Sequence, residues 1–277
     1  MSGGTLQQAA RAALAAADPG EKLELTALAA AAWRAGALAL AHDDAPVALE
    51  PGRPARPLLV GVRSVPRRGL GSADGRAALL HAVAHIEFNA INLAWDAVAR
   101  FAGLPRAYYD DWVACADDEA RHFRMLSTRL AELGHAYGDF DAHDGLWSAA
   151  RDTAHDCLAR MALVPRVLEA RGLDVTPGMI ARLRAVGDEA TVAILEVILR
   201  EEVAHVAAGS RWFAHLCRER GLEPRATFVD LIGERGRGAL RAPFNRPARR
   251  AAGFDDDELA ELDRLAAEIS RPGGAHP

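Results

Sequence analysis

Residues 118–122 read Asp-Glu-Ala-Arg-His, and residues 201–205 read Glu-Glu-Val-Ala-His. Each segment places a glutamate three residues before a histidine: Glu119 before His122, and Glu202 before His205. On an α-helix, side chains at positions i and i+3 lie about 60° apart, which puts them on the same side of the helix. The two segments therefore predict two helices that each present a carboxylate and an imidazole together.

A further glutamate precedes each segment at nearly the same distance. Glu87 lies 32 residues before Glu119, and Glu169 lies 33 residues before Glu202. The sequence near Glu87 and before Glu202 is apolar, and a carboxylate on a buried face is costly unless it is paired or bound to a metal. The four segments would supply four carboxylates and two imidazoles, which is the ligand set of a dinuclear site in a ferritin-like four-helix bundle.

The donor atoms indicate which metals to expect. A mixed shell of oxygen and nitrogen favours iron or manganese over metals that prefer thiolates. The expected cofactor is a pair of iron ions, with Mn/Fe and Mn/Mn as alternatives. The competing interpretation is that these are solvated carboxylates and ordinary helix histidines, because a single Glu-x-x-His occurs often by chance. The repetition of the motif and of its spacing favours the metal site.

The expected fold is all-α, a ferritin-like four-helix bundle with one long crossover. The first two helices are predicted at about 72–101 and 105–133, antiparallel across a short turn, so that Glu87 lies beside Glu119. The crossover, residues 134–144, can reach roughly 36 Å at about 3.3 Å per residue. A 25-residue helix is about 37 Å long, so the crossover can start the third helix parallel to the second.

The third helix is predicted at about 145–171, with a kink at Pro165. The fourth is predicted at about 188–220, and between them Gly172, Pro177 and Gly178 are expected to break the chain around a short helical piece at 179–186. Two kinds of evidence compete for the third-helix ligand: mid-helix depth favours Asp156 over Glu169 and Asp152, whereas the repeated spacing favours Glu169. We take Glu169 as the ligand.

Two further acids directly precede the repeated glutamates. Asp118 and Glu201 would point towards the adjacent helix, about 100° from the ligand beside them. Metal-bound histidines usually donate their second N–H to such a partner. We therefore expect Asp118 to accept from His205, and Glu201 from His122, with surface exposure of both acids as the alternative.

The bundle, residues 73–220, is expected to carry extensions at both ends. Residues 1–72 would form two alanine-rich helices (about 4–17 and 22–42) and a proline-rich connector that drapes over the bundle. Residues 221–277 would add a short helix at about 223–232 and a last helix ending near 269. In this extension six arginines without an intervening acid could contact phosphate or pair with carboxylates: Arg235, Arg237, Arg241, Arg246, Arg249 and Arg250, although Glu234 directly precedes them.

Composition sets limits on the class of protein. The 277 residues are 50% hydrophobic, carry a net charge of −5 and include three cysteines, an odd count that argues against a disulfide framework. No uncharged apolar stretch reaches membrane-spanning length, and the N-terminus lacks the pattern of a secretory signal. A cytoplasmic protein is expected, with no membrane or DNA partner.

Three other features have plainer interpretations. His81 and His85 form an i, i+4 pair that resembles half of a zinc site, but hydrogen-bonded helix histidines are the expected case. Tyr108 and Tyr109 could take part in redox chemistry, but core packing is expected. Trp95 is either a wall of the pocket or a core residue.

Longer stretches of this chain resemble an uncharacterised family of bacterial ferritin-like proteins, over roughly residues 55–255. The resemblance rests on HAVAHIEFNAINLAWDA, DDEARHF, YGDFDAHDGLW, LARMALVPRVLEARGLDVTPGM and REEVAHV. That family is more distantly similar to the bacterial tRNA hydroxylases that oxidise a prenylated adenosine. The two Glu-x-x-His helices and an L/I-E-A-R stretch, here Leu168–Arg171, are shared, which supports Glu169. The resemblance implies the fold and the metal chemistry but not the substrate.

The expected function is O₂ activation at a di-iron site that hydroxylates or oxidises an organic substrate. A modified nucleoside in tRNA is one candidate for that substrate, a small metabolite is another, and the electron donor is open. The alternative is iron handling, as a ferroxidase or storage protein without an organic substrate. The long N-terminal and C-terminal extensions would crowd a storage cage and favour the enzyme.

Overall fold

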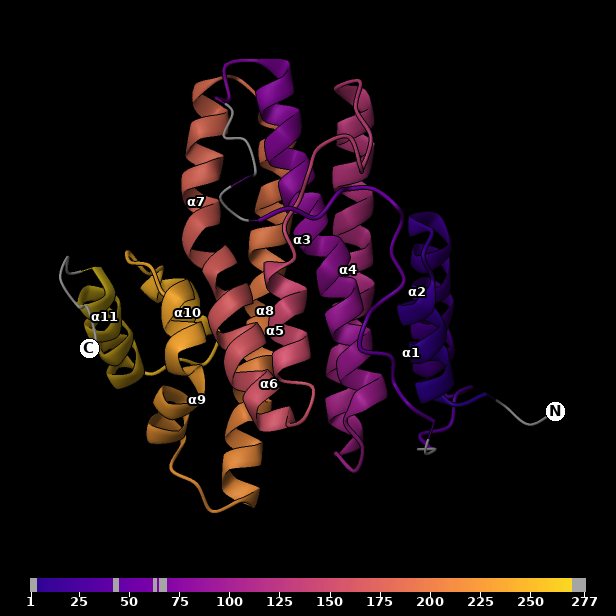
Figure 1. The fold of residues 1–277 in the computed structure, drawn as a ribbon, viewed down its shortest axis with the longest axis vertical. Helices are drawn as coiled ribbons and strands as arrows, with labels where there is room; N and C mark the ends of the chain where they lie inside the picture. Colours follow the sequence, from indigo (N-terminus) through magenta and orange to yellow (C-terminus); the bar gives the residue numbers. More distant parts are fainter. Residues whose placement is uncertain (1–3, 42–44, 62–63, 65–68, 271–277) are drawn as a thin grey trace. The chain divides into compact units, whose positions relative to one another are not determined.

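The structure is a computed structural model that describes residues 4–41, 45–61, 64 and 69–270. Within these ranges the protein is all-α, as predicted: the regular elements are helices, and the β-pairing consists of two isolated bridges (Figure 1). The chain divides into two compact units. The first takes the described residues of 1–154 and 182–194, and the second those of 155–181 and 195–277.

The centre of the first unit is a hairpin of α3 (Ala73–Arg100) and α4 (Arg106–Glu132). The two helices run antiparallel, joined by a short turn in which Gly103 adopts φ +76° (Figure 1). Ser72 caps α3 by accepting a hydrogen bond from Gly75 N at 3.1 Å. Both helices therefore begin and end within about one residue of their predicted bounds.

Two N-terminal helices pack on this hairpin, α1 (Leu6–Ala15) mainly on α3, and α2 (Pro19–Arg34) on α4. Two indole N–H groups fix α2: Trp95 donates to Thr26 Oγ1 at 2.9 Å, and Trp33 donates to Asp110 Oδ1 at 2.8 Å. These bonds attach α2 to α3 and α4, and both N-terminal helices belong to the first unit. Trp95 is thus a core residue here.

A buried lysine completes the junction of α1 and α2. Lys22 Nζ donates to the carbonyl oxygens of Ala13 at 2.7 Å and Leu14 at 3.1 Å, which lie at the C-terminal end of α1. Cations are favoured at that end of a helix because its last carbonyls lack intrahelical donors. Burial lowers the pKa of Lys22 to about 7.

The described part of the connector is extended and lies against the first unit, as predicted. Gly52 N donates to Leu14 O at 2.8 Å, and Arg100 donates to Ala48 O at 2.8 Å. A Cβ at Gly52 would lie only 2.0 Å from Ala15 O, so no other residue fits there without a shift of backbone. The connector is therefore held by main-chain contacts at several points.

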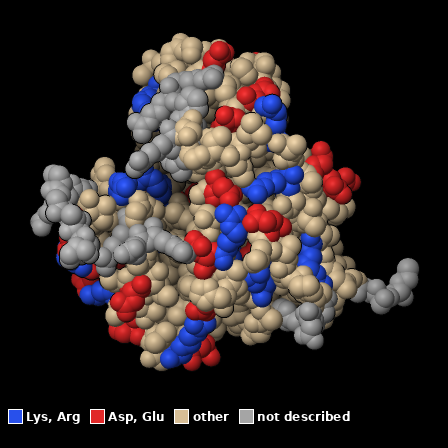
Figure 2. Space-filling view, in the orientation of Figure 1, with Lys and Arg blue, Asp and Glu red and all other residues tan. Residues whose placement is uncertain are grey.

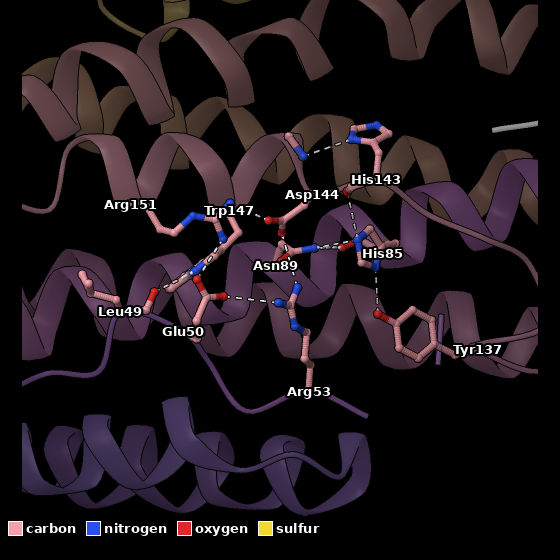
Figure 3. Close-up of polar contacts among 11 residues, drawn as sticks. Leu49, Glu50, Arg53, His85, Asn89, Tyr137, His143, Asp144, Trp147 and Arg151 are labelled. Carbon is pink, nitrogen blue, oxygen red and sulfur yellow. Dashed lines mark hydrogen bonds and ion pairs between the residues drawn. The ribbon is translucent and has the colours of Figure 1, made fainter. Parts of the chain in front are cut away.

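A closed ring of ion pairs joins this connector to α5 (Gly145–Asp152) and the residue before it. Arg53 pairs with Glu50 (3.2 Å) and Asp144 (3.4 Å), and Arg151 pairs with the same two acids (3.0 and 2.7 Å). Figure 3 shows the four side chains facing one another, with Trp147 donating to Leu49 O at 3.0 Å beside them.

The second unit contains the remaining helices. They are α6 (Cys157–Leu163), the π-helix η2 (Val164–Glu169), α7 (Ala170–Ala185), α8 (Glu189–Glu219), α9 (Pro224–Ala239), α10 (Arg246–Ala251) and α11 (Asp256–Ser270), with the last turn of α7 and the first turn of α8 in the first unit. Helices α8, α9 and α11 lie close to their predictions, although α9 continues past a kink at Gly233. The short α10 was not predicted.

The predicted third helix is wrong in its details. The chain leaves α5 at Asp152 and starts again at Asp156, whose side chain caps α6 by accepting from Leu158 N at 3.0 Å. At Pro165 the helix widens into the π-turn η2 instead of only kinking. Proline supplies no N–H to the helical ladder, so the turn that contains it is free to widen.

The predicted break at Pro177 and Gly178 is also wrong, because α7 runs through both. Pro177 has no N–H to donate to Leu173 O, four residues earlier. Asn245, far along the chain, donates its Nδ2 to that carbonyl at 3.0 Å. The missing hydrogen bond is thus replaced from outside the helix. Among the described residues, no helix has the length and apolar character to cross a membrane.

Candidate metal centre

Helices α3 and α4 bring three of the predicted ligands together. His122 Nδ1 lies 3.1 Å from Glu87 Oε2 and 3.5 Å from Glu119 Oε2. The three residues are 0–3% exposed, and each offers a ligand atom within 4.8 Å of the others. The antiparallel hairpin therefore sets Glu87 beside the Glu-x-x-His of α4, as the spacing predicted.

The carboxylates dominate the electrostatics of this group. Burial alone would lower the pKa of His122, but the hydrogen bonds with Glu119 and Glu87 outweigh burial and raise that pKa to about 11. In the metal-free protein a proton on His122 therefore balances part of the charge of two buried glutamates. A divalent cation would replace that proton, because a neutral imidazole and carboxylates are its natural ligands. The donor set fits iron or manganese.

The second Glu-x-x-His lies on α8, in the part of that helix that belongs to the second unit. His205 Nδ1 is 3.6 Å from Glu202 Oε1, and the His205 side chain is 3% exposed. The helical geometry predicted from the i, i+3 spacing is confirmed for this pair.

The two rival third-helix ligands have different surroundings. Asp156 accepts from Arg220 at 2.6 and 2.9 Å, and this pairing holds the pKa of its carboxyl below the usual value. Glu169 is the last residue of η2 and is half-buried. The carboxylate of Asp156 thus caps α6 and pairs with Arg220. Glu169 remains the predicted ligand.

The expected hydrogen-bond partners of the metal-bound histidines also stay predictions. Asp118 pairs with Arg121 at 2.7 Å and is 37% exposed, and Glu201 lies 3.6 Å from Arg200 with 24% exposure. Both acids thus form ion pairs with arginines of their own helices.

The other histidines and tyrosines follow the plainer interpretation. His85 hydrogen-bonds through Nδ1 to Tyr137 OH at 2.9 Å and through Nε2 to His143 O at 3.2 Å (Figure 3), and His81 Nε2 accepts from Gly138 N at 2.9 Å. Neither forms half of a zinc site. The hydroxyls of Tyr108 and Tyr109 donate to backbone carbonyls in the core, at 3.3 and 2.9 Å.

Sequence reasoning missed Tyr137, which lies in the crossover. Its ring packs against Phe88 and Phe123, with centroids 5.4 and 5.0 Å away. Phe88 directly follows Glu87, and Phe123 directly follows His122. The three rings therefore form an aromatic layer beside the ligands. The crossover sequence YGDF contains two aromatic residues, Tyr137 and Phe140, which could have indicated that this segment packs on the bundle.

The arginine-rich stretch pairs mainly with carboxylates. Arg246 binds Asp263 (2.6 Å), Arg250 binds Asp256 (2.8 Å), and Arg249, 1% exposed, binds both oxygens of Asp174. The side chains of residues 235 and 237 lie outside the described part of the structure. On the face drawn in Figure 2, basic and acidic residues likewise lie next to one another, without a large area of one charge.

Residues 15–260 match the protein family described as "Protein of unknown function (DUF455)". The chain belongs to this family. It is also 46% identical, over 213 residues, to a protein of Haemophilus influenzae described as an uncharacterized protein, with 74% of each chain covered. No solved structure matches the chain significantly. The predicted kinship with an uncharacterised bacterial family is thus confirmed at the level of the family.

Proposed function

We propose that this protein is a dinuclear non-haem metal protein, most simply a di-iron oxygenase, on a ferritin-like bundle. The observation that carries the proposal is the buried group of Glu87, Glu119 and His122. Three ionisable side chains in one dry place are costly, and a metal ion balances the charge of two carboxylates. On the repeated spacing we take Glu202 as a further proposed ligand.

The remaining predicted ligands are Glu169 and His205. With them the chain would offer four carboxylates and two imidazoles to hold the pair of ions. Iron held in this way would supply the reaction with O₂, which oxidises or hydroxylates an organic substrate. The chain itself contributes the ligand positions. The rings of Phe88, Phe123 and Tyr137 add a packed apolar layer next to Glu87 and His122 in the chain.

Metal analysis of the purified protein tests the proposal. Wild type should hold two iron or manganese ions per chain, and Glu119→Gln and Glu202→Gln should each lose at least one. Glu132→Gln is the matched control, because Glu132 lies on α4 but is 55% exposed and pairs with Arg129. Two metals retained in both ligand variants would refute the site.

Reaction with O₂ separates the enzyme from an iron-handling protein. The reduced, metal-loaded protein should consume O₂ faster when its substrate is present, and it should not take up iron beyond two ions per chain. Continued uptake and oxidation of added ferrous iron would instead favour the iron-handling function.

A modified nucleoside in tRNA and a small metabolite are the two candidate substrates, and tRNA is the simpler one to test first. Bulk tRNA would be incubated with the reduced protein and O₂, digested, and compared by mass for nucleosides that gain one oxygen atom. If no nucleoside changes, a small metabolite becomes the better candidate.

A further inference from the structure

The segment that carries Glu169 is held on both sides by the C-terminal extension. On the N-terminal side, Arg166 of η2 binds Glu258 of α11 at 2.5 Å, with both side chains buried (3% and 9% exposed). The Arg166 guanidinium also lies over three aromatic rings, with its carbon 4.7, 4.4 and 4.6 Å from the centroids of Phe213, Phe228 and Phe254. One carboxylate and two aromatic rings of the extension, Phe228 and Phe254, therefore hold this guanidinium, together with Phe213 of α8.

The second attachment lies five residues beyond Glu169. Asp174 of α7 accepts two hydrogen bonds from Arg249, at 3.0 and 2.7 Å, and one from Asn245 N at 2.9 Å. The pair is 1% and 3% exposed. Phe254 connects the two attachments, because the Arg249 guanidinium lies 5.2 Å from the ring that also contacts Arg166.

The turn between the attachments is an unusual one. A π-turn carries an extra residue relative to an α-turn, so it rotates every following side chain about the helix axis. Pro165 opens this turn and packs against Gly209 of α8, where an added Cβ would lie 2.4 Å from Pro165 Cβ and Cγ. The direction of Glu169 thus depends on whether the wide turn is kept.

Buried ion pairs suit the task of fixing a conformation. Compared with apolar packing they add little net stability, but loss of one partner leaves a buried charge uncompensated. The two pairs here have no role in the proposed ligand set, and both lie within five residues of Glu169.

We propose that the C-terminal extension is a positioning device for the metal centre: its Glu258 and Arg249 lock η2 and α7 so that Glu169 is aimed at the second metal ion. This inference rests on the proposed function. Arg166, Asp174, Arg249 and Glu258 are positioning residues, since they act through Glu169 and not on the metal.

Two isosteric variants test it, Glu258→Gln and Asp174→Asn. The glutamine keeps an oxygen for the hydrogen bond that Glu258 accepts from Asp255 N, so the cap of α11 is retained. Asp263→Asn is the control, because it removes a surface ion pair of the same extension, with Arg246. Mn²⁺ binding to the apoprotein would be titrated by calorimetry in wild type, the three variants and Glu169→Gln.

The two clamp variants, Glu258→Gln and Asp174→Asn, should bind the first Mn²⁺ ion with the affinity of wild type. Their affinity for the second Mn²⁺ ion should be about 10–100-fold weaker, which is the range found when residues that support metal ligands are lost. Glu169→Gln should give the same pattern, and Asp263→Asn should match wild type. Unchanged affinity for both ions in the two clamp variants would overturn the inference. A wild type that binds fewer than two ions would overturn the proposed function, and this inference with it.

A second measurement does not depend on metal. In apoprotein carrying Glu258→Gln, amide hydrogen exchange of residues 164–170 should accelerate relative to wild type, while exchange in α3 and α4 stays the same. Unchanged protection of the η2 amides would show that the extension does not hold the turn, and would also overturn the proposal.

Discussion

Arg220, the residue that follows α8, binds Asp156 through both carboxylate oxygens, at 2.6 and 2.9 Å. The same carboxylate caps α6 by accepting from Leu158 N. Mid-helix depth was the reason to weigh Asp156 as a metal ligand, and that reason disappears because a helix begins at this residue. Metal binding by variants of Asp156 and Glu169 can now decide which of the two residues is the ligand.

Asp156→Asn should weaken folding but leave metal binding intact. Asparagine can still cap α6, but loss of the charge that pairs with the partly exposed Arg220 should lower the free energy of unfolding by up to about 1 kcal/mol. Glu169→Gln should do the reverse, with little change in the urea midpoint and loss of one metal per chain. Urea denaturation and metal content of the two variants would be measured together. One metal lost in Asp156→Asn and none in Glu169→Gln would contradict the assignment.

The metal-free protein should lose stability as the solution becomes alkaline. The pKa of His122 is raised to about 11 in the folded protein, compared with an ordinary value of 6.5. A raised pKa means that the folded state holds the proton more tightly, so the contribution to stability is complete below pH 6.5 and is lost as pH rises through about 11. Urea midpoints would be measured in chelator between pH 6 and 10.

His122→Gln provides the comparison for this pH dependence. The variant cannot take up the proton, so its midpoint should fall less over the same pH interval. Equal slopes for wild type and His122→Gln would show that another group causes the alkaline loss, and that His122 is not held protonated by Glu87 and Glu119.

A methyl group at position 52 should be poorly tolerated. The Cβ of Gly52→Ala would lie 2.0 Å from Ala15 O and 2.5 Å from Ala15 C, and backbone atoms cannot swing aside. A loss of about 1–3 kcal/mol in the free energy of unfolding is expected for such overpacking. Gly71→Ala is the control in the same connector, because an added Cβ there meets nothing within 4 Å. Similar midpoints for the two variants would refute the close contact.

Asn245 and Pro177 should be coupled although they are far apart in sequence. Asn245→Ala leaves the Leu173 carbonyl without a donor and should cost about 1–3 kcal/mol, including the loss of the α10 cap. Pro177→Ala restores an N–H to that carbonyl, so Asn245→Ala should cost less in a Pro177→Ala background. A double-mutant cycle measured by urea unfolding would give the coupling. A coupling of zero would mean that α7 tolerates Pro177 for another reason.

These contacts explain which parts of the fold the sequence could predict. The bounds of α3, α4 and α8 follow from local signals, namely long apolar runs, Ser72 as a cap, and Gly103 and Gly134 after helix ends. The course of α7 through Pro177 depends on Asn245, the residue that caps α10. The end of α5 and the start of α6 depend on Arg220 in the same way. The local sequence pattern of a helix does not indicate which distant residues will contact it.

The same division applies to the candidate site. Glu119 and His122 could be predicted because their relation is a property of a single helix. Pairing with Glu87 required only the short turn between α3 and α4. Tyr137 could not be placed in this way, because its contacts with Phe88 and Phe123 depend on the path of the crossover. The direction of the Glu169 side chain depends on a π-turn and on the C-terminal extension, whose Glu258 lies about 90 residues further along the chain.

The hairpin of α3 and α4 has a consequence for the order of events during synthesis. Glu87, Glu119 and His122 lie within 36 consecutive residues, and the loop that must close between their helices is only a few residues long. Contacts so close along the chain form fast, since little loop entropy is lost. Half of the proposed ligands can thus assemble while α8 is still inside the ribosome, before the other proposed ligands have emerged.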